Sequence, residues 1–287
     1  MIKIIIHKQS KGIKILAPIL KKELDKIGEF SQVIVGGDLD KISAKSQAIF
    51  FVLTPHKFTN FRRVNKRAKF IMYQQEQLLL DSDMGIFRFK QLKKFIDLFD
   101  HIVDVSELNL PAYGKLGRKV DYILPTAYHE DFEYNCSVED KIKYDCLFFG
   151  RYSDKPRRKE ILNKLNKEFN FYPKFEGIYD FELKKAIKQS KIILNIHQSD
   201  GFFPEWLRII LGIANKRLVI SEPLKGIAPL NINRDIIVAR DYELPKKIFH
   251  YLNDRDDYDK VVQEAYNLVK KRYRMENYVK EMAHKLL

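Results

Sequence analysis

The segment 194–210 holds side chains whose types and spacing suit the binding of a phosphorylated ligand. A short apolar run ends at Asn195 and His197, and a loop containing Gly201 and Phe202 follows it. A helix is predicted to begin directly after this loop, because a proline stands where its first turn would form. The free N–H groups and the positive dipole end of such a helix favour a bound phosphate.

Two charged residues lie in the first turn of this predicted helix. Arg208 could donate two parallel hydrogen bonds to a diphosphate, and Glu205 could accept hydroxyl protons from a sugar. Their spacing also allows a plain surface ion pair, worth only about 0.2–0.5 kcal/mol. A second apolar run ends at Ser221 and Glu222, and parallel strands end on one edge of their sheet. We therefore predict a single binding site built from these residues.

Short apolar, β-branched runs alternate with longer helical patterns along nearly the whole chain. Strands are predicted at residues 2–7, 32–35, 48–53, 70–73, 101–105 and 120–124, and again at 145–149, 171–175, 191–196, 218–221 and 236–238. Helices are predicted at residues 13–27, 86–98, 157–169, 181–189, 205–215, 245–252 and 256–286. This alternation indicates parallel sheets covered by helices on both faces.

The rhythm of strands and helices stops at Pro125 and restarts near residue 144. The polar, aperiodic residues between these points are predicted to form a linker at 126–143. With 287 residues, the chain is long enough for two domains. The predicted fold class is therefore α/β, with two Rossmann-like, doubly wound parallel-sheet domains, 1–125 and 144–255, facing each other across a cleft.

The order of the motifs resembles that of a known group of enzymes. Asn-x-His at 195–197, Glu-x-x-Arg-Ile at 205–209 and Val-Ile-Ser-Glu at 219–222 resemble the donor-binding region of GT-B glycosyltransferases. Within that class the chain looks like the CgeB-like / glycosyltransferase family 1-4-like group of bacterial and viral enzymes. A strand, glycine turn and basic helix at 144–164 and a Tyr-x-x-Glu-Gln segment at 73–77 resemble the same group.

The resemblance implies an enzyme that moves a sugar from a nucleotide-diphosphate-sugar to a glycan, glycolipid or glycoprotein acceptor, with neither a metal ion nor a cofactor. It places the acceptor on the N-terminal domain and the donor on the C-terminal domain, with helix 256–287 packing back toward the N-terminal domain. The implied donor-binding residues are Gly150, Arg151, Asn195, His197, Gly201, Phe202, Glu205, Arg208, Ser221 and Glu222. The implied catalytic residues are Arg208 and, as candidates for a general base, Glu76, His56 and His7.

Two residues depart from the pattern of the group. Leu211 stands where many relatives have a glutamate that holds the ribose, and Lys216 stands where glycine is common. The ribose contact then has to come from another residue, for which Glu222 is the candidate.

Acidic pairs of the form Asp-x-Asp hold a divalent ion in metal-dependent GT-A transferases. Such pairs occur at Asp38–Asp40, Asp81–Asp83 and Asp254–Asp256. None of them follows a mid-chain strand in the way that a GT-A site requires. We therefore predict metal-independent transfer, in which the helix start at the donor site replaces the ion.

The formal net charge of +14 favours an anionic partner, which can be a phosphorylated ligand, an acidic membrane surface or nucleic acid. The densest basic run, Lys57–Lys69, contains six basic residues and no acidic one. It is either a solvated helix face or a patch that contacts an acceptor or an anionic membrane. Nucleic acid is the less favoured partner, because no known nucleic-acid-binding motif occurs.

Two alternatives to glycan transfer stay open at this level. One is a transferase that acts on modified DNA bases, and the other is a Rossmann-like protein that binds nucleic acid or sugar nucleotides without turnover. Cys136 and Cys146 match neither a disulfide framework nor a zinc motif, and Cys146 is predicted to be a core residue. No signal peptide or membrane span is predicted, so we expect a cytoplasmic protein, with peripheral membrane contact as an open alternative.

Overall fold

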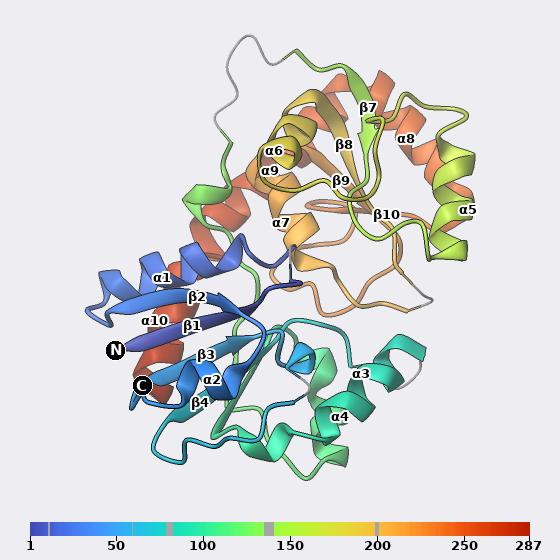
Figure 1. The fold of residues 1–287 in the computed structure, drawn as a ribbon. Helices are drawn as coiled ribbons and strands as arrows, with labels where there is room; N and C mark the ends of the chain where they lie inside the picture. The colour runs from blue at the N-terminus through green and yellow to red at the C-terminus, as the bar shows by residue number, and fades with distance from the viewer. Residues whose placement is uncertain (11, 59, 79–82, 135–140, 199–200) are drawn as a thin grey trace. The chain divides into compact units, whose positions relative to one another are not determined.

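Two separate parallel β-sheets organise the chain in its computed structural model (Figure 1). The chain divides into two compact units: unit 1 contains residues 1–125 and 275–287, and unit 2 contains residues 126–274. Each unit has its own sheet and its own hydrophobic core. The structure describes residues 1–10, 12–58, 60–78, 83–134, 141–198 and 201–287.

Unit 1 is built on a six-stranded parallel sheet with the strand order β2-β1-β3-β4-β5-β6. The strands are β1 (Ile2–His7), β2 (Ser31–Gly36), β3 (Ile49–Leu53), β4 (Lys69–Gln74), β5 (His101–Asp104) and β6 (Tyr122–Ile123). The central strands are apolar on both faces, as in the sequence IFFVL of β3, because both faces of a parallel sheet are covered. The rings of Phe50 and Phe70 stack across β3 and β4 with centroids 5.1 Å apart.

The helices of unit 1 are α1 (Leu16–Lys26), α2 (Leu39–Ser43), α3 (Asp83–Lys93), α4 (Leu110–Lys115) and α10 (Met275–Leu286). Phe50 and Phe70 of the sheet share one core with Phe95, which follows α3, and with Tyr113 of α4. Helix α10, from the end of the chain, packs beside α1 (Figure 1). Unit 1 therefore includes a segment that follows all of unit 2 in the sequence.

Unit 2 is built on a four-stranded parallel sheet with the strand order β10-β9-β8-β7. The strands are β7 (Tyr144–Leu147), β8 (Ser190–Asn195), β9 (Leu218–Ser221) and β10 (Ile237–Val238). The helices are α5 (Pro156–Leu165), α6 (Asp180–Gln189), α7 (Trp206–Ala214), α8 (Leu244–Asn253) and α9 (Arg255–Arg272). Apolar residues of α5, α8 and α9 share one core with the sheet, and the almost wholly buried α7 packs against β8 and β9.

The predicted fold class is confirmed, because both units are α/β with parallel sheets, and most predicted elements form within a few residues of their expected bounds. The predicted strand at 171–175 is wrong, since a single isolated bridge joins Phe171 to Cys146 of β7. Cys146 is buried in the core as predicted, and Cys136 lies outside the described residues. The described part of the expected linker, 126–143, is included in unit 2.

The single closing helix predicted over 256–286 is also wrong, because two helices occupy this segment. Helix α9 ends at Arg272 after three consecutive basic residues, which are favourable at a helix C-terminus. The non-helical Tyr273 follows, and its ring packs against the indole of Trp206 with centroids 5.2 Å apart. The break between α9 and α10 thus coincides with this tertiary contact.

The basic run 57–69 forms no α-helix in the part that the structure describes. Arg63 donates to the Asp100 carboxylate at 2.8 and 2.9 Å, and Lys69 donates to the Leu286 carbonyl at 2.6 Å. Part of the charge thus stabilises unit 1 itself, while the exposed basic residues of the run are Arg62, Lys66 and Arg67. Within the described ranges, no helix is both long enough and apolar enough to cross a membrane.

The docking of α10 gives a test of the fold. Met282 lies on its buried face and is 1% exposed. We expect Met282→Ala to lower the free energy of unfolding by about 2–5 kcal/mol, because the side chain leaves a cavity that the neighbours fill only in part. Lys280→Ala, at an exposed position of the same helix, should change it by less than about 0.5 kcal/mol. Urea denaturation measures both, and equal stability of the two variants would contradict the docking.

Candidate functional site

The carboxyl ends of β7, β8 and β9 lie on one edge of the unit 2 sheet, and donor-binding residues were predicted after each of them. Asn195 of β8 pairs in register with Ser221 of β9, and its amide nitrogen donates to the Ser221 hydroxyl at 2.9 Å. Both residues are fully buried. They therefore fasten two strand ends together and do not present their side chains to solvent.

Arg208, in the first turn of α7, is buried and surrounded by acceptors from the protein. Its Nε and Nη2 donate to the Phe149 carbonyl at 3.0 and 2.8 Å, and its Nη1 donates to Asn195 Oδ1 at 2.7 Å. Nη2 also pairs with the Glu205 carboxylate at 2.8 Å. Burial lowers the pKa of Arg208 to about 10, which keeps it charged at pH 7. The guanidinium ties α7 to the ends of β7 and β8 and presents no free fork to a diphosphate.

Arg158 of α5 is a second buried arginine, and the sequence interpretation missed it as a site residue. Its Nη1 donates to the Arg151 carbonyl at 2.7 Å. Its Nη2 donates to the Ile196 carbonyl and to Glu205 Oε1, both at 2.8 Å. The sequence could have indicated the burial of Arg158, because the spacing 158, 162 and 165 places it on the same helix face as two buried leucines.

Glu205 precedes α7 as its N-cap residue and pairs with both buried arginines. Burial raises the pKa of the Glu205 carboxyl, but Arg208 and Arg158 outweigh this effect and lower the pKa to about 2. Both guanidinium groups also lie over the ring of Phe148, at 4.7 and 5.0 Å from its centroid. Glu205 is thus a carboxylate at neutral pH and is engaged by cations of the protein.

Gly150 follows β7 with a φ angle of +154°, close to these two arginines. A Cβ atom at this position would lie 2.7 Å from Arg208 Nη2 and 3.2 Å from the ring of Phe148. Glycine is therefore required for both the backbone angle and the close approach. The next side chain, Arg151, is 64% exposed and lies 3.8 Å from Asp154. It carries a positive charge into solvent at this edge.

Glu222, directly after β9, is buried and holds two neighbouring groups. Its Oε2 accepts from the His197 backbone N–H at 2.7 Å and from Arg157 Nη1 at 3.1 Å, and its Oε1 pairs with Arg157 Nη2. His197 Nε2 lies 2.9 Å from the Pro223 carbonyl, and burial lowers the pKa of its imidazole. The predicted residues His197 and Glu222 thus shape the edge, while Arg157, which was not predicted, carries a half-buried charge there.

The loop before α7 brings backbone and aromatic groups to the same edge. Gly201 has a φ angle of 153°, and Phe202 is 43% exposed with Lys225 Nζ 4.6 Å above its ring. Residues 199–200 lie outside the described residues. Backbone hydrogen bonding to Glu205 begins at the Arg208 N–H, so the earlier N–H groups of the helix have no intrahelical acceptor.

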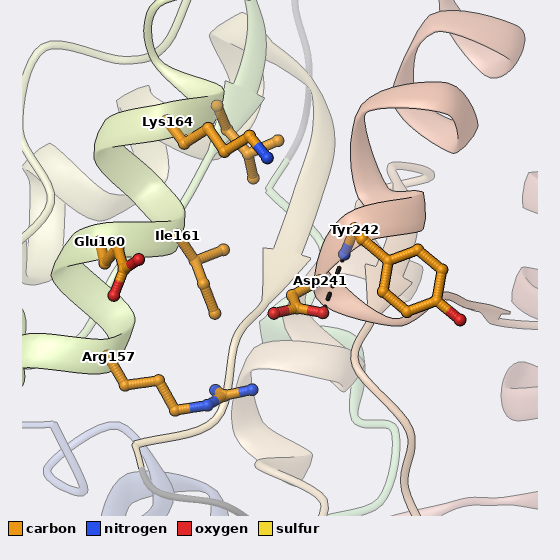
Figure 2. A pocket seen from close by; sticks show the side chains of 7 residues that line it. Arg157, Glu160, Ile161, Lys164, Asp241 and Tyr242 are labelled. Carbon is orange, nitrogen blue, oxygen red and sulfur yellow. Dashed lines mark hydrogen bonds between the residues drawn. The ribbon is translucent and has the colours of Figure 1, made fainter.

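A cavity of about 160 Å³ lies between α5 and the turn that precedes α8, and Figure 2 shows the side chains that line it. Its lining combines basic, acidic, apolar and aromatic side chains, which are Arg157, Glu160, Ile161, Lys164, Leu165, Asp241 and Tyr242. Arg157 belongs both to this lining and to the pair with Glu222, so the cavity adjoins the end of β9.

Of the three candidate bases in unit 1, His7 is the last residue of β1, His56 follows β3 and Glu76 follows β4. His7 is buried, and its Nδ1 accepts from the Gln9 N–H at 3.3 Å. Glu76 pairs with Arg88 Nη2 at 2.5 Å. Burial lowers the pKa of His56 to about 4, with Glu76 opposing and Arg88 adding to the effect. The structure therefore groups His56, Glu76 and Arg88, and the catalytic role of each candidate base stays a prediction.

Three of the described Asp-x-Asp residues accept hydrogen bonds from backbone N–H groups. Asp38 and Asp254 cap helices by accepting from backbone N–H groups. Asp40 accepts from the N–H groups of Arg62 and Val64 at 2.8 and 3.0 Å. The pair at 81–83 lies partly outside the described residues.

Known proteins resemble this chain in both sequence and fold. Residues 155–284 match the family model described as glycosyl transferase-like. HepE of Anabaena, solved in complex with UDP-glucose, is similar over 99% of this chain and 98% of its own, with a TM-score of 0.67 and 9% identity. A glycosyltransferase from Rickettsia africae is similar over 99% of this chain and 96% of its own, with a TM-score of 0.59 and 17% identity. No curated protein matches the chain significantly in sequence.

A UDP-N-acetylglucosamine 2-epimerase shares the architecture as well, with a TM-score of 0.62 and 12% identity over 100% of this chain and 95% of its own. At such identities the likeness shows the fold alone, and that fold is GT-B. The sequence match assigns residues 155–284 to a glycosyl transferase-like family, and the chain has the GT-B fold.

The pair of arginines around Glu205 predicts a pH-dependent stability. Glu205→Gln should lower the free energy of unfolding at pH 7. Breaking a buried ion pair costs roughly 3–5 kcal/mol, and we expect a decrease at the lower end of this range because 36% of the Glu205 side chain is exposed. The folded-state pKa of about 2 lies below the usual 4.5, so this stability is present above pH 4.5 and is lost as the pH falls toward 2.

Urea denaturation at pH 7 and pH 3 measures this effect. The difference in stability between the wild type and Glu205→Gln should shrink at pH 3. The exposed Glu168→Gln serves as the control and should differ little from the wild type at either pH. A Glu205→Gln protein as stable as this control at pH 7 would rule out the arrangement.

Proposed function

We propose that the chain transfers a sugar from a nucleoside-diphosphate-sugar bound at the carboxyl edge of the unit 2 sheet. The observation that carries this proposal is the arrangement around Glu205, where two buried arginines hold the loops after β7 and β8 against the start of α7. A helix N-terminus and a glycine turn are thereby fixed at one edge, where a diphosphate is favoured. The family match over 155–284 and the UDP-glucose bound to HepE support the same assignment.

Two of the groups that would meet the diphosphate, Arg151 and the start of α7, were expected, and a third, Arg157, was not. Arg151 is exposed, Arg157 is held in place by Glu222, and the first N–H groups of α7 have no helical acceptor. Positive groups that are already oriented stabilise the charge that develops on a departing diphosphate. We infer that these groups act without a divalent ion, and that Arg208 acts through the position of α7.

The ribose contact also needs another residue. Leu211 is fully buried in the core, so it reaches no ligand, and both oxygens of Glu222 are engaged by Arg157 or by the His197 backbone. The cavity shown in Figure 2 adjoins Arg157 and offers carboxylates and the exposed Tyr242. We propose that its rim supplies the ribose contact.

For the acceptor we propose a glycan, glycolipid or glycoprotein. The high net charge is the one feature that favours a modified DNA base instead. DNA binding that weakens steeply with salt would distinguish this second acceptor class. Contact with an anionic membrane stays a prediction for the exposed residues Arg62, Lys66 and Arg67. Vesicle binding would test it.

The donor proposal predicts stabilisation by one class of nucleotide sugar. In a buffer containing EDTA, UDP-glucose, UDP-N-acetylglucosamine or GDP-mannose should raise the melting temperature, since a ligand at ~100 times its dissociation constant adds about 2.7 kcal/mol. The bound donor should then release free nucleoside diphosphate on turnover. Formation of the 2-epimer of the donor sugar would instead indicate an epimerase, and no stabilisation by any donor would refute donor binding.

Arg151 provides a site variant that should not disturb folding. Arg151→Ala should lower kcat/KM for the donor by roughly 10²-fold, comparable to the loss of one preorganised donor in a transition state. Its exposed ion pair with Asp154 contributes at most about 1 kcal/mol to stability, so the melting temperature of the variant should equal that of the wild type. Lys167→Ala removes the same charge at another exposed position and is the control. Similar kinetics for both variants would remove Arg151 from the site.

A further inference from the structure

Helix α6 of unit 2 carries an exposed stripe of one aromatic and two basic side chains (Figure 1). The stripe, hereafter the α6 stripe, consists of Phe181, Lys184 and Lys185. Residues three and four positions apart lie on one face of a helix, so these side chains are neighbours. The opposite face contains the buried residues of the helix, which packs against β7 and β8. The α6 stripe therefore needs no further role in the core of unit 2.

Apolar side chains are unusually exposed at both ends of α6. Phe181 is 80% exposed, the largest fraction of any large apolar side chain in the described part of the chain. Tyr179, the residue before the helix, is 38% exposed, and Ile142 is 39% exposed. The Lys143 backbone N–H donates to the Gln189 carbonyl at 2.9 Å, so the exposed segment 141–143 adjoins the end of α6. A single exposed apolar residue is ordinary, but here three occur around one helix.

The charge around α6 is predominantly positive. The fully exposed basic residues are Lys141, Lys143, Lys184 and Lys185. Glu182, on the flank of the helix, is neutralised by Lys174 at 2.9 Å. Asp180 lies in the first turn, where the helix dipole favours a negative charge. The exposed face of the helix thus offers a partner positive charge together with apolar area.

An anionic lipid surface matches both properties. Aromatic side chains are favourable at the headgroup level of a bilayer, and lysines extend their apolar stems along it while the ammonium stays in water. Anionic lipids attract lysines that lie close to the membrane. A second copy of the chain fits less well, because a twofold contact through this face would place lysines opposite lysines. Nucleic acid is also disfavoured, because the sequence contains no known nucleic-acid-binding motif.

We propose that the α6 stripe docks unit 2 on an anionic lipid surface, with Phe181 entering the headgroup region and the neighbouring lysines contacting the anionic headgroups. This surface is separate from the basic run 57–69, which belongs to unit 1. The inference does not depend on the proposed donor or acceptor. One aromatic side chain and a few lysines support only reversible, peripheral binding. The binding should weaken as the salt concentration rises, because exposed charges are screened.

The test uses the full chain and sedimentation with vesicles of phosphatidylcholine, either alone or mixed with phosphatidylserine. The wild type should bind the mixed vesicles and not the pure ones. Lys184→Gln/Lys185→Gln should weaken this binding by about ten-fold or more, because each lysine near an anionic surface contributes roughly five-fold. Lys246→Gln/Lys260→Gln removes the same charge from exposed positions of α8 and α9 and should bind nearly like the wild type. Both variants should keep the wild-type melting temperature, because all four side chains are exposed.

Phe181 allows a direct measurement of insertion. The chain contains one tryptophan, Trp206, which is 4% exposed, so Phe181→Trp adds a tryptophan at an exposed position. Its fluorescence emission should move to shorter wavelength with the mixed vesicles and stay unchanged with pure phosphatidylcholine. Phe181→Ser should weaken vesicle binding by about five-fold or more, because less apolar surface leaves water.

Four outcomes would overturn the inference. The wild type could fail to bind the mixed vesicles, or Lys184→Gln/Lys185→Gln could bind them as well as its control. The Phe181→Trp emission could stay unchanged while the protein is bound. Loss of binding in Lys66→Gln/Arg67→Gln, with the α6 variants unaffected, would place the contact on the basic run of unit 1. Binding of a DNA or RNA oligonucleotide that requires Lys184 and Lys185, without vesicle binding, would assign the face to nucleic acid and equally overturn the proposal.

Discussion

The carboxylate of Glu205, shared by Arg158 and Arg208, is the interaction on which the candidate donor edge depends. Burying two guanidinium groups is unfavourable unless each is both paired and hydrogen-bonded. Each arginine meets this condition by donating to backbone carbonyls after β7 or β8 as well as to Glu205. Movement of either loop would break the bonds that make the buried charges tolerable, so the charges themselves keep the loops in place.

This constraint decides where ligand-binding charge can appear. At Gly150 a side chain would collide with Arg208, so the chain passes close to the buried cations, and the next residue, Arg151, turns to solvent. Glu222 in turn accepts from the backbone of His197 and holds Arg157. We propose that a ligand at this edge meets Arg157 already oriented by Glu222, since an oriented positive group stabilises developing negative charge without reorganising first.

The sequence predicted the sheets, most element bounds and the grouping of the strand-end residues, because these follow from local periodicity and from parallel strands ending on one edge. It did not predict that two arginines would be buried. Arg208 stands in the otherwise apolar helix WLRIILGIA, and Arg158 is in line with two buried leucines, yet both residue types usually face solvent. The break at Tyr273 coincides with its packing against Trp206, and neither glycine nor proline marks it.

The same reasoning explains why a net charge of +14 says little about where ligands bind. Arg63 is neutralised by Asp100, and Arg88 is neutralised by Glu76, so these cations of unit 1 stabilise structure. Sugar transfer needs positive groups where the diphosphate departs and uncharged hydrogen-bonding groups where a neutral hydroxyl is chosen. We propose that the exposed Arg151 in unit 2 meets the first of these needs, and its position is not visible in the overall composition.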